Sequence, residues 1–329
     1  MAQRANLLII ESGRGTLYYD HWCANRLDDE LFWGPEEALH FIRQRDPLGA
    51  DGWLDEVWCE GAAVVDVDQR VLLFFGGEDL LFDARARRVF LDLLRRQWTG
   101  WDVRWAPEGI MSVADYVRLP REQFASEKEY EPETFVVADE NVLLTESHAG
   151  GVRMSVLHGL SECLLAGADA LDRVLRGRWL GLSGGARWRQ HLVWKGDEFP
   201  QGGIHLDRQR RSIMTWWGDD TRDLRRKMSG PWSGWTIDWR YDDYDPHLAL
   251  CGPALVLPPF DVAETQRRLL DHLEAGLVDS LPRNPAREIT LAEGGQLSEW
   301  TDHSRGRQHS DRKRARLAEL RQELGIHTQ

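Results

Sequence analysis

The sequence predicts an α+β fold: a tandem duplication of one ββαββαβ unit, with antiparallel sheets that carry helices on one face, followed by a C-terminal helical extension. The first observation is a tryptophan motif, W-[ST]-G-W-x-[VI]-x-W, which occurs at residues 98–105 and again at 232–239. The second is that other segments recur in the same order: 6–12 resembles 141–147, and 66–76 resembles 207–218, which is one residue longer. Because the matching segments follow one another in the same order in both halves, they indicate duplication of a whole unit.

Short apolar runs separated by turn residues predict the strands of each unit. Turns with Gly13 and Gly150 connect the first hairpin, and polar residues connect the second. In the tryptophan motif, Trp101, Val103 and Trp105 alternate, as on one face of a strand. The predicted strands are 7–10, 16–20, 62–65 and 71–75 in the first copy and 142–145, 152–156, 203–206 and 212–217 in the second, each copy closing with the tryptophan motif.

Two helices are predicted in each unit. The first begins near Pro35, because proline suits the first helical turn and the acidic Glu36 and Glu37 favour the positive end of the helix dipole. The expected helices are near 35–42 and 84–97 in the first copy and near 168–175 and 221–228 in the second.

Composition along the chain sets the expected domain boundaries. The first repeat covers 1–119, a charged linker 120–134, the second repeat 135–252, and the helical C-terminal extension 253–329. In the extension, leucines at helical spacing predict an amphipathic helix at 261–277 and a polar helix at 310–324.

The net charge, the lengths of the apolar stretches and the cysteine content favour a cytoplasmic protein. The 329 residues carry a net charge of −13, which opposes general binding to nucleic acid or to an anionic membrane. No apolar stretch has the length of a signal peptide core or a membrane helix. The four cysteines stand far apart and are interpreted as small buried apolar residues. The preference for Arg over Lys is typical of a high-GC bacterial genome.

Four residues are candidate catalytic groups: Asp20, His21, Glu11 and His205. A histidine can act as general base near neutral pH, although adjacent Asp20 and His21 would point to opposite faces of a strand and would not pair. Glu11 aligns with Glu146 of the second copy, which leaves open a structural role in the turn or a carboxylate pair between symmetric units. No metal motif and no cofactor motif is present, so neither a metal nor a cofactor is predicted.

Aromatic residues are the candidate binding groups. The chain has 16 tryptophans, and aromatic side chains are enriched where proteins bind one another. The simpler interpretation of the tryptophan motif is a core signature of the fold, with Trp98 and Trp232 as the members expected at the surface. The candidate binding residues are Tyr19, Trp22, Trp33, Trp98, Trp232 and Trp217.

Three functions remain open from the sequence. The first is a non-catalytic, inhibitor-like or immunity-like module that binds another protein through an acidic, tryptophan-rich surface. The second is a metal-independent hydrolase or transferase with its site in a cleft between the repeats. The third is a nucleic-acid-associated factor that uses the basic tail, 303–329, whose alternative role is to dock on the acidic body of the same chain. Neither the oligomeric state nor the packing of the two repeats follows from the sequence.

Overall fold

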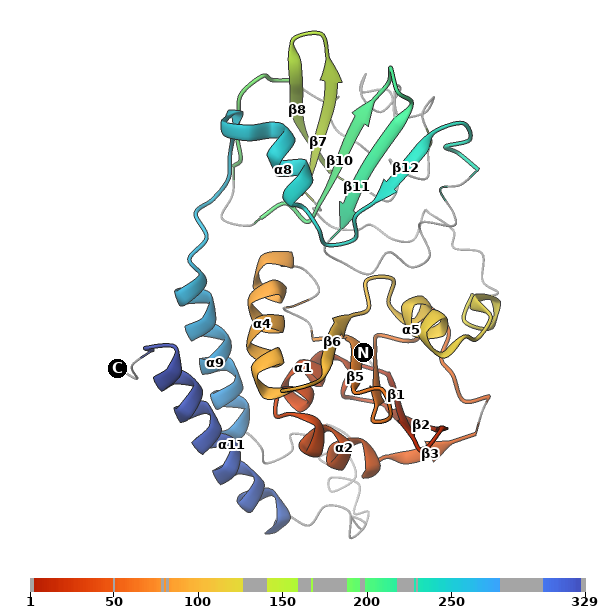
Figure 1. Cartoon of the computed structure of the whole chain (residues 1–329), viewed down its shortest axis with the longest axis vertical. Helices are drawn as coiled ribbons and strands as arrows, with labels where there is room; N and C mark the ends of the chain where they lie inside the picture. The colour runs from red at the N-terminus through yellow and green to blue at the C-terminus, as the bar shows by residue number, and fades with distance from the viewer. Residues whose placement is uncertain are drawn as a thin grey trace, which may run out of the picture.

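A computed structural model describes residues 3–49, 51–77, 80, 83–126, 141–158, 167, 188–195, 199–217, 228, 230–278 and 304–326. The fold of these residues is α+β, with a six-stranded sheet, a five-stranded sheet, a two-stranded sheet and seven α-helices. Figure 1 shows the two large sheets in separate halves of the molecule, the first half below and the second above. The predicted helix at 168–175, residues 221–227 of the predicted helix at 221–228, and residues 127–134 of the predicted linker lie outside the described residues.

The first sheet is mixed, and not antiparallel as expected. Its strands stand in the order β3-β2-β1-β4-β5-β6, with β1–β4 and β5–β6 parallel and the other pairs antiparallel. Parallel neighbours need a crossover connection, which α4 (Ala84–Gln97) supplies between β5 and β6. The strands are β1 (Ala5–Glu11), β2 (Arg14–Asp20), β3 (Asp46–Leu48), β4 (Gly61–Asp66), β5 (Val71–Phe75) and β6 (Asp102–Trp105).

The second sheet repeats this topology. Its order, β8-β7-β10-β11-β12, matches β2-β1-β4-β5-β6, and each pair of neighbours has the same relative direction in both sheets. The strands are β7 (Asn141–His148), β8 (Gly151–His158), β10 (Gly202–Asp207), β11 (Ser212–Trp217) and β12 (Thr236–Trp239). The small parallel sheet joins β9 (Leu192–Val193) to β13 (Leu255–Val256).

The strand registers correct one expected equivalence. Glu11 closes the first hairpin opposite Arg14, and His148 closes the corresponding hairpin opposite Gly151. His148 therefore occupies the place of Glu11, and Glu146 occupies the place of Ile9. The predicted pairing of Glu11 with Glu146 as equivalent carboxylates is wrong by two residues, because the sequence resemblance aligned the residues and not the turns.

Helices cover both faces of the first sheet, so the expectation of helices on one face is wrong. Alternate residues of a strand point to opposite faces. Leu7 and Phe74 pack with residues of α1 (Leu27–Leu31), α2 (Pro35–Arg43) and α4. Leu8 and Leu73 pack on the other side with α5 (Ile110–Val117). Both faces are thus buried, and full burial of one such side chain contributes about 1.5–3 kcal/mol.

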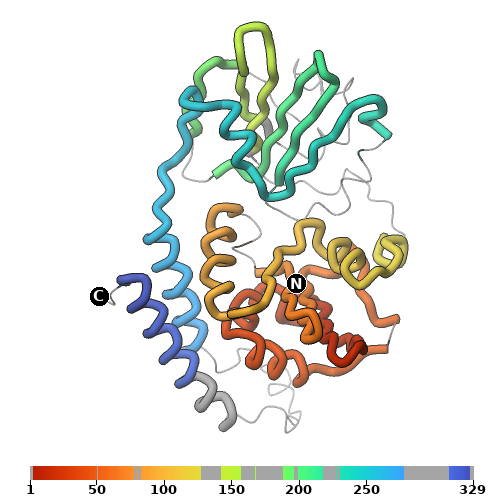
Figure 2. Tube along the Cα trace, viewed as in Figure 1, coloured from red at the N-terminus to blue at the C-terminus, as the bar shows by residue number. Residues whose placement is uncertain are grey.

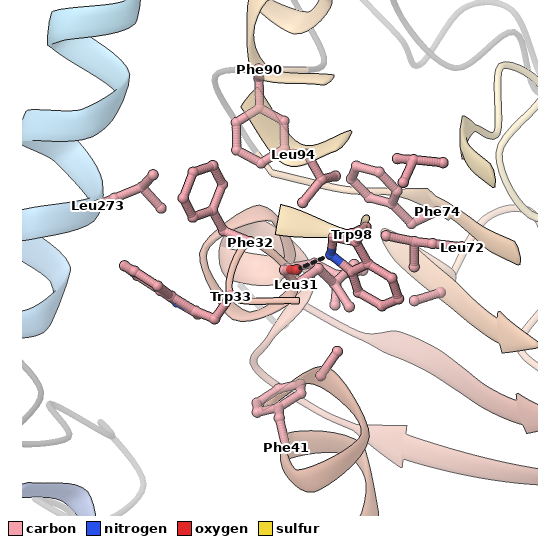
Figure 3. Close-up of a cluster of buried hydrophobic side chains, with 14 of the residues drawn as sticks. Leu31, Phe32, Trp33, Phe41, Leu72, Phe74, Phe90, Leu94, Trp98 and Leu273 are labelled. Carbon is pink, nitrogen blue, oxygen red and sulfur yellow. Dashed lines mark hydrogen bonds between the residues drawn. The ribbon is translucent and has the colours of Figure 1, made fainter. Parts of the chain in front are cut away.

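The tryptophan motif builds the same corner in both halves. Trp98 follows α4, is fully buried, and donates its indole Nε1–H to the carbonyl of Leu31 at 2.8 Å (Figure 3). Its ring lies edge-on to Trp101 at 5.0 Å, and Trp232 meets Trp235 in the same way at 5.2 Å. The intervening Gly100 and Gly234 both have φ +79°, a left-handed conformation that favours glycine. The motif is therefore a core element.

The C-terminal extension returns to the first half instead of leaving the body (Figure 2). Helix α9 (Val262–Val278) packs on α4, and α11 (Ser304–Glu323) packs on α9. Leu273 and Leu320 are buried in the core that α4 and the first sheet share. The guanidinium of Arg321 is 2.8 Å from carboxylate oxygens of both Asp271 and Glu274.

Basic side chains of α11 also contact Trp33. Arg316 donates to the Trp33 carbonyl at 3.0 Å, and the Lys313 ammonium stands 5.1 Å from the Trp33 ring centroid. Together with Arg321, these contacts dock the basic tail on the body of the chain, which is the alternative to nucleic-acid binding that the sequence left open.

Three arginines of α4 join the two halves. Arg88 donates to the Asp245 carboxylate at 2.8 Å and lies 3.8 Å from the Tyr244 ring centroid. Arg85 stands between the rings of Phe199 and Phe260, at 4.3 and 4.6 Å. Arg87 is 3.5 Å from the Asp242 carboxylate. At α4 the two halves therefore meet in a packed interface.

Candidate functional site

The structure does not bring the four candidate catalytic residues together. Glu11 and Asp20 stand at opposite ends of the β1–β2 hairpin, about 20 Å apart for six residues of strand. Each is held by an arginine: Arg43 is 2.9 Å from Glu11, and Arg45 is 2.5 Å from Asp20. His205 lies in the second half of the molecule, on β10.

His21 has an aromatic environment, and among the described residues no carboxylate is hydrogen-bonded to it. The Tyr19 hydroxyl is 2.6 Å from its Nδ1, and its ring lies edge-on to Trp22 at 4.6 Å. Asp20 accepts the Trp22 backbone N–H at 2.7 Å, which shapes the loop after β2. The expectation that Asp20 and His21 do not pair agrees with these contacts.

These side chains belong to an aromatic set at one end of the first sheet, the aromatic end, defined as Tyr19, His21, Trp22 and Trp58. His21 and Trp58 are exposed, and Tyr19 and Trp22 are half-buried. Gln3 donates its backbone N–H to the His21 carbonyl and accepts from the backbone N–H of Ala24. The carbonyl of the next residue, Arg4, accepts from the backbone N–H of Glu60. The guanidinium of Arg4 lies 4.4 Å from the Trp58 ring centroid. Trp58 is 45% exposed, the largest aromatic side chain among the exposed hydrophobic residues of the described chain.

Four of the predicted binding tryptophans are in the core and do not form a surface. Trp33, Trp98, Trp217 and Trp232 are all buried, and Figure 3 shows Trp33 and Trp98 among the side chains of the first core. Trp98 and Trp232 hold the corner after a helix, so burial and not binding explains the motif. Of the predicted binding residues, only Tyr19 and Trp22 keep a partly exposed side chain.

His205 belongs to a second site, which the sequence did not predict as a whole. It is a chain of buried polar groups, here called the polar layer: Ser147, Thr145, His205, His247 and Trp216. The Thr145 hydroxyl is 2.8 Å from Nδ1 of His205 and 2.6 Å from Nε2 of His247. Ser147 Oγ is 3.1 Å from Nε2 of His205. The Trp216 indole donates to Nδ1 of His247 at 2.8 Å.

The elements that position the polar layer follow from strand register. Thr145 on β7 pairs with His205 on β10, so their side chains share one face of the sheet. Helix α8 (Asp245–Cys251) crosses this face and brings in His247, which is fully buried. Gly203 leaves room for the contact, because a Cβ there would stand 2.1 Å from Trp216 Nε1 and 2.4 Å from His247 Nδ1.

The donor and acceptor capacities of these groups determine which atom donates in each hydrogen bond of the polar layer. An indole N–H can only donate, so His247 Nδ1 is an acceptor and the proton of the neutral ring is on Nε2. Thr145 then accepts from His247 and donates to Nδ1 of His205, which puts the His205 proton on Nε2, directed at Ser147. Every donor from Trp216 to His205 has an acceptor, and the direction runs from Trp216 to Ser147.

Burial keeps both imidazoles neutral. Desolvation lowers the pKa of His247 to about 3, with a further contribution from His205. Desolvation also lowers the pKa of His205, against the opposing charges of Asp207 and Glu146. In its neutral form with the proton on Nε2, His205 is a hydrogen-bond donor to Ser147 and not a base.

Positions in the first half that correspond to the polar layer are apolar. By register, Thr145 matches Leu8, His205 matches Val64, and Trp216 matches Phe75. Those three residues pack with α5 in an apolar cluster. The fold therefore accepts an apolar layer at this place, and the polar layer is a property of the second half.

Within the described residues, no group of three or more His, Cys, Asp and Glu side chains could hold a metal ion. No helix in the part of the chain that the structure describes has the length and apolar character to cross a membrane. Comparison of the chain with protein-family models, with curated proteins and with solved structures finds no match.

Proposed function

We propose that the protein is a non-catalytic binding module that recognises another protein through the aromatic end. The observation that carries this proposal is the exposure of Trp58, together with Tyr19, His21 and Trp22, at one end of a sheet that is otherwise covered on both faces. Trp, Tyr and Arg side chains provide most of the energy of protein interfaces, and Arg4 stacks on Trp58.

Charge supports a basic partner. The chain carries −13, and the aromatic end is bordered by the exposed Asp46, which pairs with Tyr19 across β2–β3, and by exposed Glu60. Complementary charge steers association and suppresses wrong partners. The module would act by covering a basic surface of its partner.

A cytoplasmic location forms part of the proposal. Cys23, Cys59 and Cys251 are buried and free, as thiols are in reducing compartments.

The experiment compares capture of partners by the full chain and by two variants. We expect one stoichiometric protein to bind the wild type, with binding weakened at least tenfold by Trp58→Ala and by Trp22→Ala. Leu250→Ala is the matched control, since Leu250 is an exposed apolar residue on α8, in the second half. A partner that all three variants retain equally, or the absence of any partner, would contradict the proposal.

A duplication is proposed as the origin of the two halves. Its support is the common strand order and direction, the repeated tryptophan corner, and turns of equal length at 67–70 and 208–211. Arg70 and Arg211, the last residues of those turns, have φ values of +52° and +51°. With turns of equal length, the extra residue of the second copy is Trp217 at the end of β11.

A further inference from the structure

The polar layer ends at a hydroxyl group that has a proton left to donate. Ser147 accepts from Nε2–H of His205, and no described residue accepts the proton of Ser147. Ser147 is half-buried, whereas the groups behind it are buried, so Ser147 is the point at which the chain of hydrogen bonds reaches the surface. Hydrogen bonds in series polarise one another, which strengthens the terminal donor.

The first half shows that this arrangement is not needed for folding. Leu8, Val64 and Phe75 fill the corresponding positions with apolar contacts. A buried polar chain stabilises a protein less than an apolar layer of the same shape, unless all of its groups are satisfied. The presence of two histidines and a threonine at these positions of the second half therefore points to a use for the group at the end of the chain.

An acidic side chain stands next to that group. Leu206 pairs with Glu146, so the following residues, Asp207 and Ser147, are neighbours on the same face of β10 and β7. The Asp207 carboxylate accepts the Arg210 backbone N–H through Oδ1 at 2.9 Å, and its Oδ2 is 3.6 Å from the exposed Arg210 side chain. A donor and a carboxylate acceptor are thus presented side by side.

We infer that Ser147 and Asp207 form a binding site for a small amide group, whose carbonyl oxygen accepts from the Ser147 hydroxyl while its N–H donates to Asp207. A carboxylate ligand does not fit as well, because the Asp207 carboxylate beside Ser147 repels an anion. This site lies in the second half and is separate from the aromatic end.

The test uses the full chain and observes the His205 ring by ¹⁵N NMR during titration with N-methylacetamide. We expect a saturable shift of the His205 Nε2 resonance, about three- to tenfold weaker binding in Ser147→Ala, and no change in Tyr19→Ala. Acetate is the matched probe, and it should bind more weakly than the amide to the wild type. Asp207→Asn, which keeps the shape of the site, should remove the discrimination against acetate.

Three results would overturn the inference. They are the absence of a saturable shift, equal binding of acetate and amide by the wild type, and unchanged amide binding in both Ser147→Ala and Asp207→Asn. If Ser147→Ala does not fold, Asp207→Asn alone decides, through the ratio of amide to acetate affinity. Because Tyr19→Ala tests only the aromatic end, failure of this site and failure of the proposed protein interface are distinguishable.

Discussion

The indole of Trp216 donates to Nδ1 of His247 at 2.8 Å, and this one contact determines where the protons of both buried histidines lie. It also makes protonation of His247 unfavourable, since a charged ring would need Nδ1 for its own proton. Burial and this contact together favour the neutral ring, whose pKa is about 3 in the folded chain against an ordinary value of 6.5.

Stability is therefore expected to fall with acid through His247. The folded pKa is lower than the unfolded one, so the contribution is complete above pH 6.5 and is lost as the pH falls towards 3. The loss approaches about 1.4 kcal/mol per pH unit for one group. Urea unfolding between pH 7 and 4 measures it, and His247→Gln should flatten the profile. An identical slope in this variant would contradict the assignment.

Thr145→Val tests the middle of the polar layer. Valine keeps the shape of threonine but leaves His247 Nε2–H without an acceptor and His205 Nδ1 without a donor, at about 1–3 kcal/mol for each unsatisfied group. Thr145→Ser keeps the hydroxyl and should lose much less. Thr99→Val, which removes an exposed hydroxyl that donates to the Arg96 carbonyl, is the control and should change the free energy of unfolding by less than about 0.5 kcal/mol.

Gly203→Ala should strain the contact between β10 and α8. The added Cβ would stand 2.1 Å from Trp216 Nε1, so the indole or His247 must move, at about 1–3 kcal/mol. Gly49→Ala is the matched control, because a Cβ there meets nothing within 4 Å. Equal thermal midpoints for the two variants would show that the contact is not as tight as the structure has it.

Leu320→Ala tests whether the C-terminal helices complete the first core. Leu320 is buried with Leu273 against α4, so truncation should lower the free energy of unfolding by about 2–5 kcal/mol. Glu319, its exposed neighbour on α11, gives a control variant, Glu319→Ala, with little expected effect. A neutral result for Leu320→Ala would mean that α11 does not pack on the body in solution.

Arg88→Ala should weaken the coupling between the two halves. The variant removes the ion pair with Asp245 and the contact with the Tyr244 ring. We expect the wild type to unfold in a single calorimetric transition, and the transition of the variant to broaden or divide into two. Arg95→Ala, which removes an exposed pair with Asp92 on the same helix, should leave the transition unchanged.

Local patterns in the sequence predicted most of the described secondary structure. Alternation and turn residues placed the strands of both hairpins, and proline, acidic residues and apolar spacing placed α2, α4 and α9. The repeated tryptophan motif indicated a common core element, but the burial of Trp98 and Trp232, which were predicted as binding residues, was seen only in the structure. The predicted features depend on neighbours within a few residues, so the sequence carries them directly.

Tertiary structure alone decided the rest. Whether neighbouring strands run parallel depends on the path of the connecting helix, and the equivalence of Glu146 with Ile9 depends on hairpin register. Thr145, His205 and His247 meet because register and the crossing of α8 bring them together over 102 residues of chain, a distance at which no sequence spacing is informative. The alternation of Thr145 with Ser147 on one face of β7 was a local sign of the polar layer. Secondary structure follows from local chemistry, but a site follows from which faces the chain brings into contact.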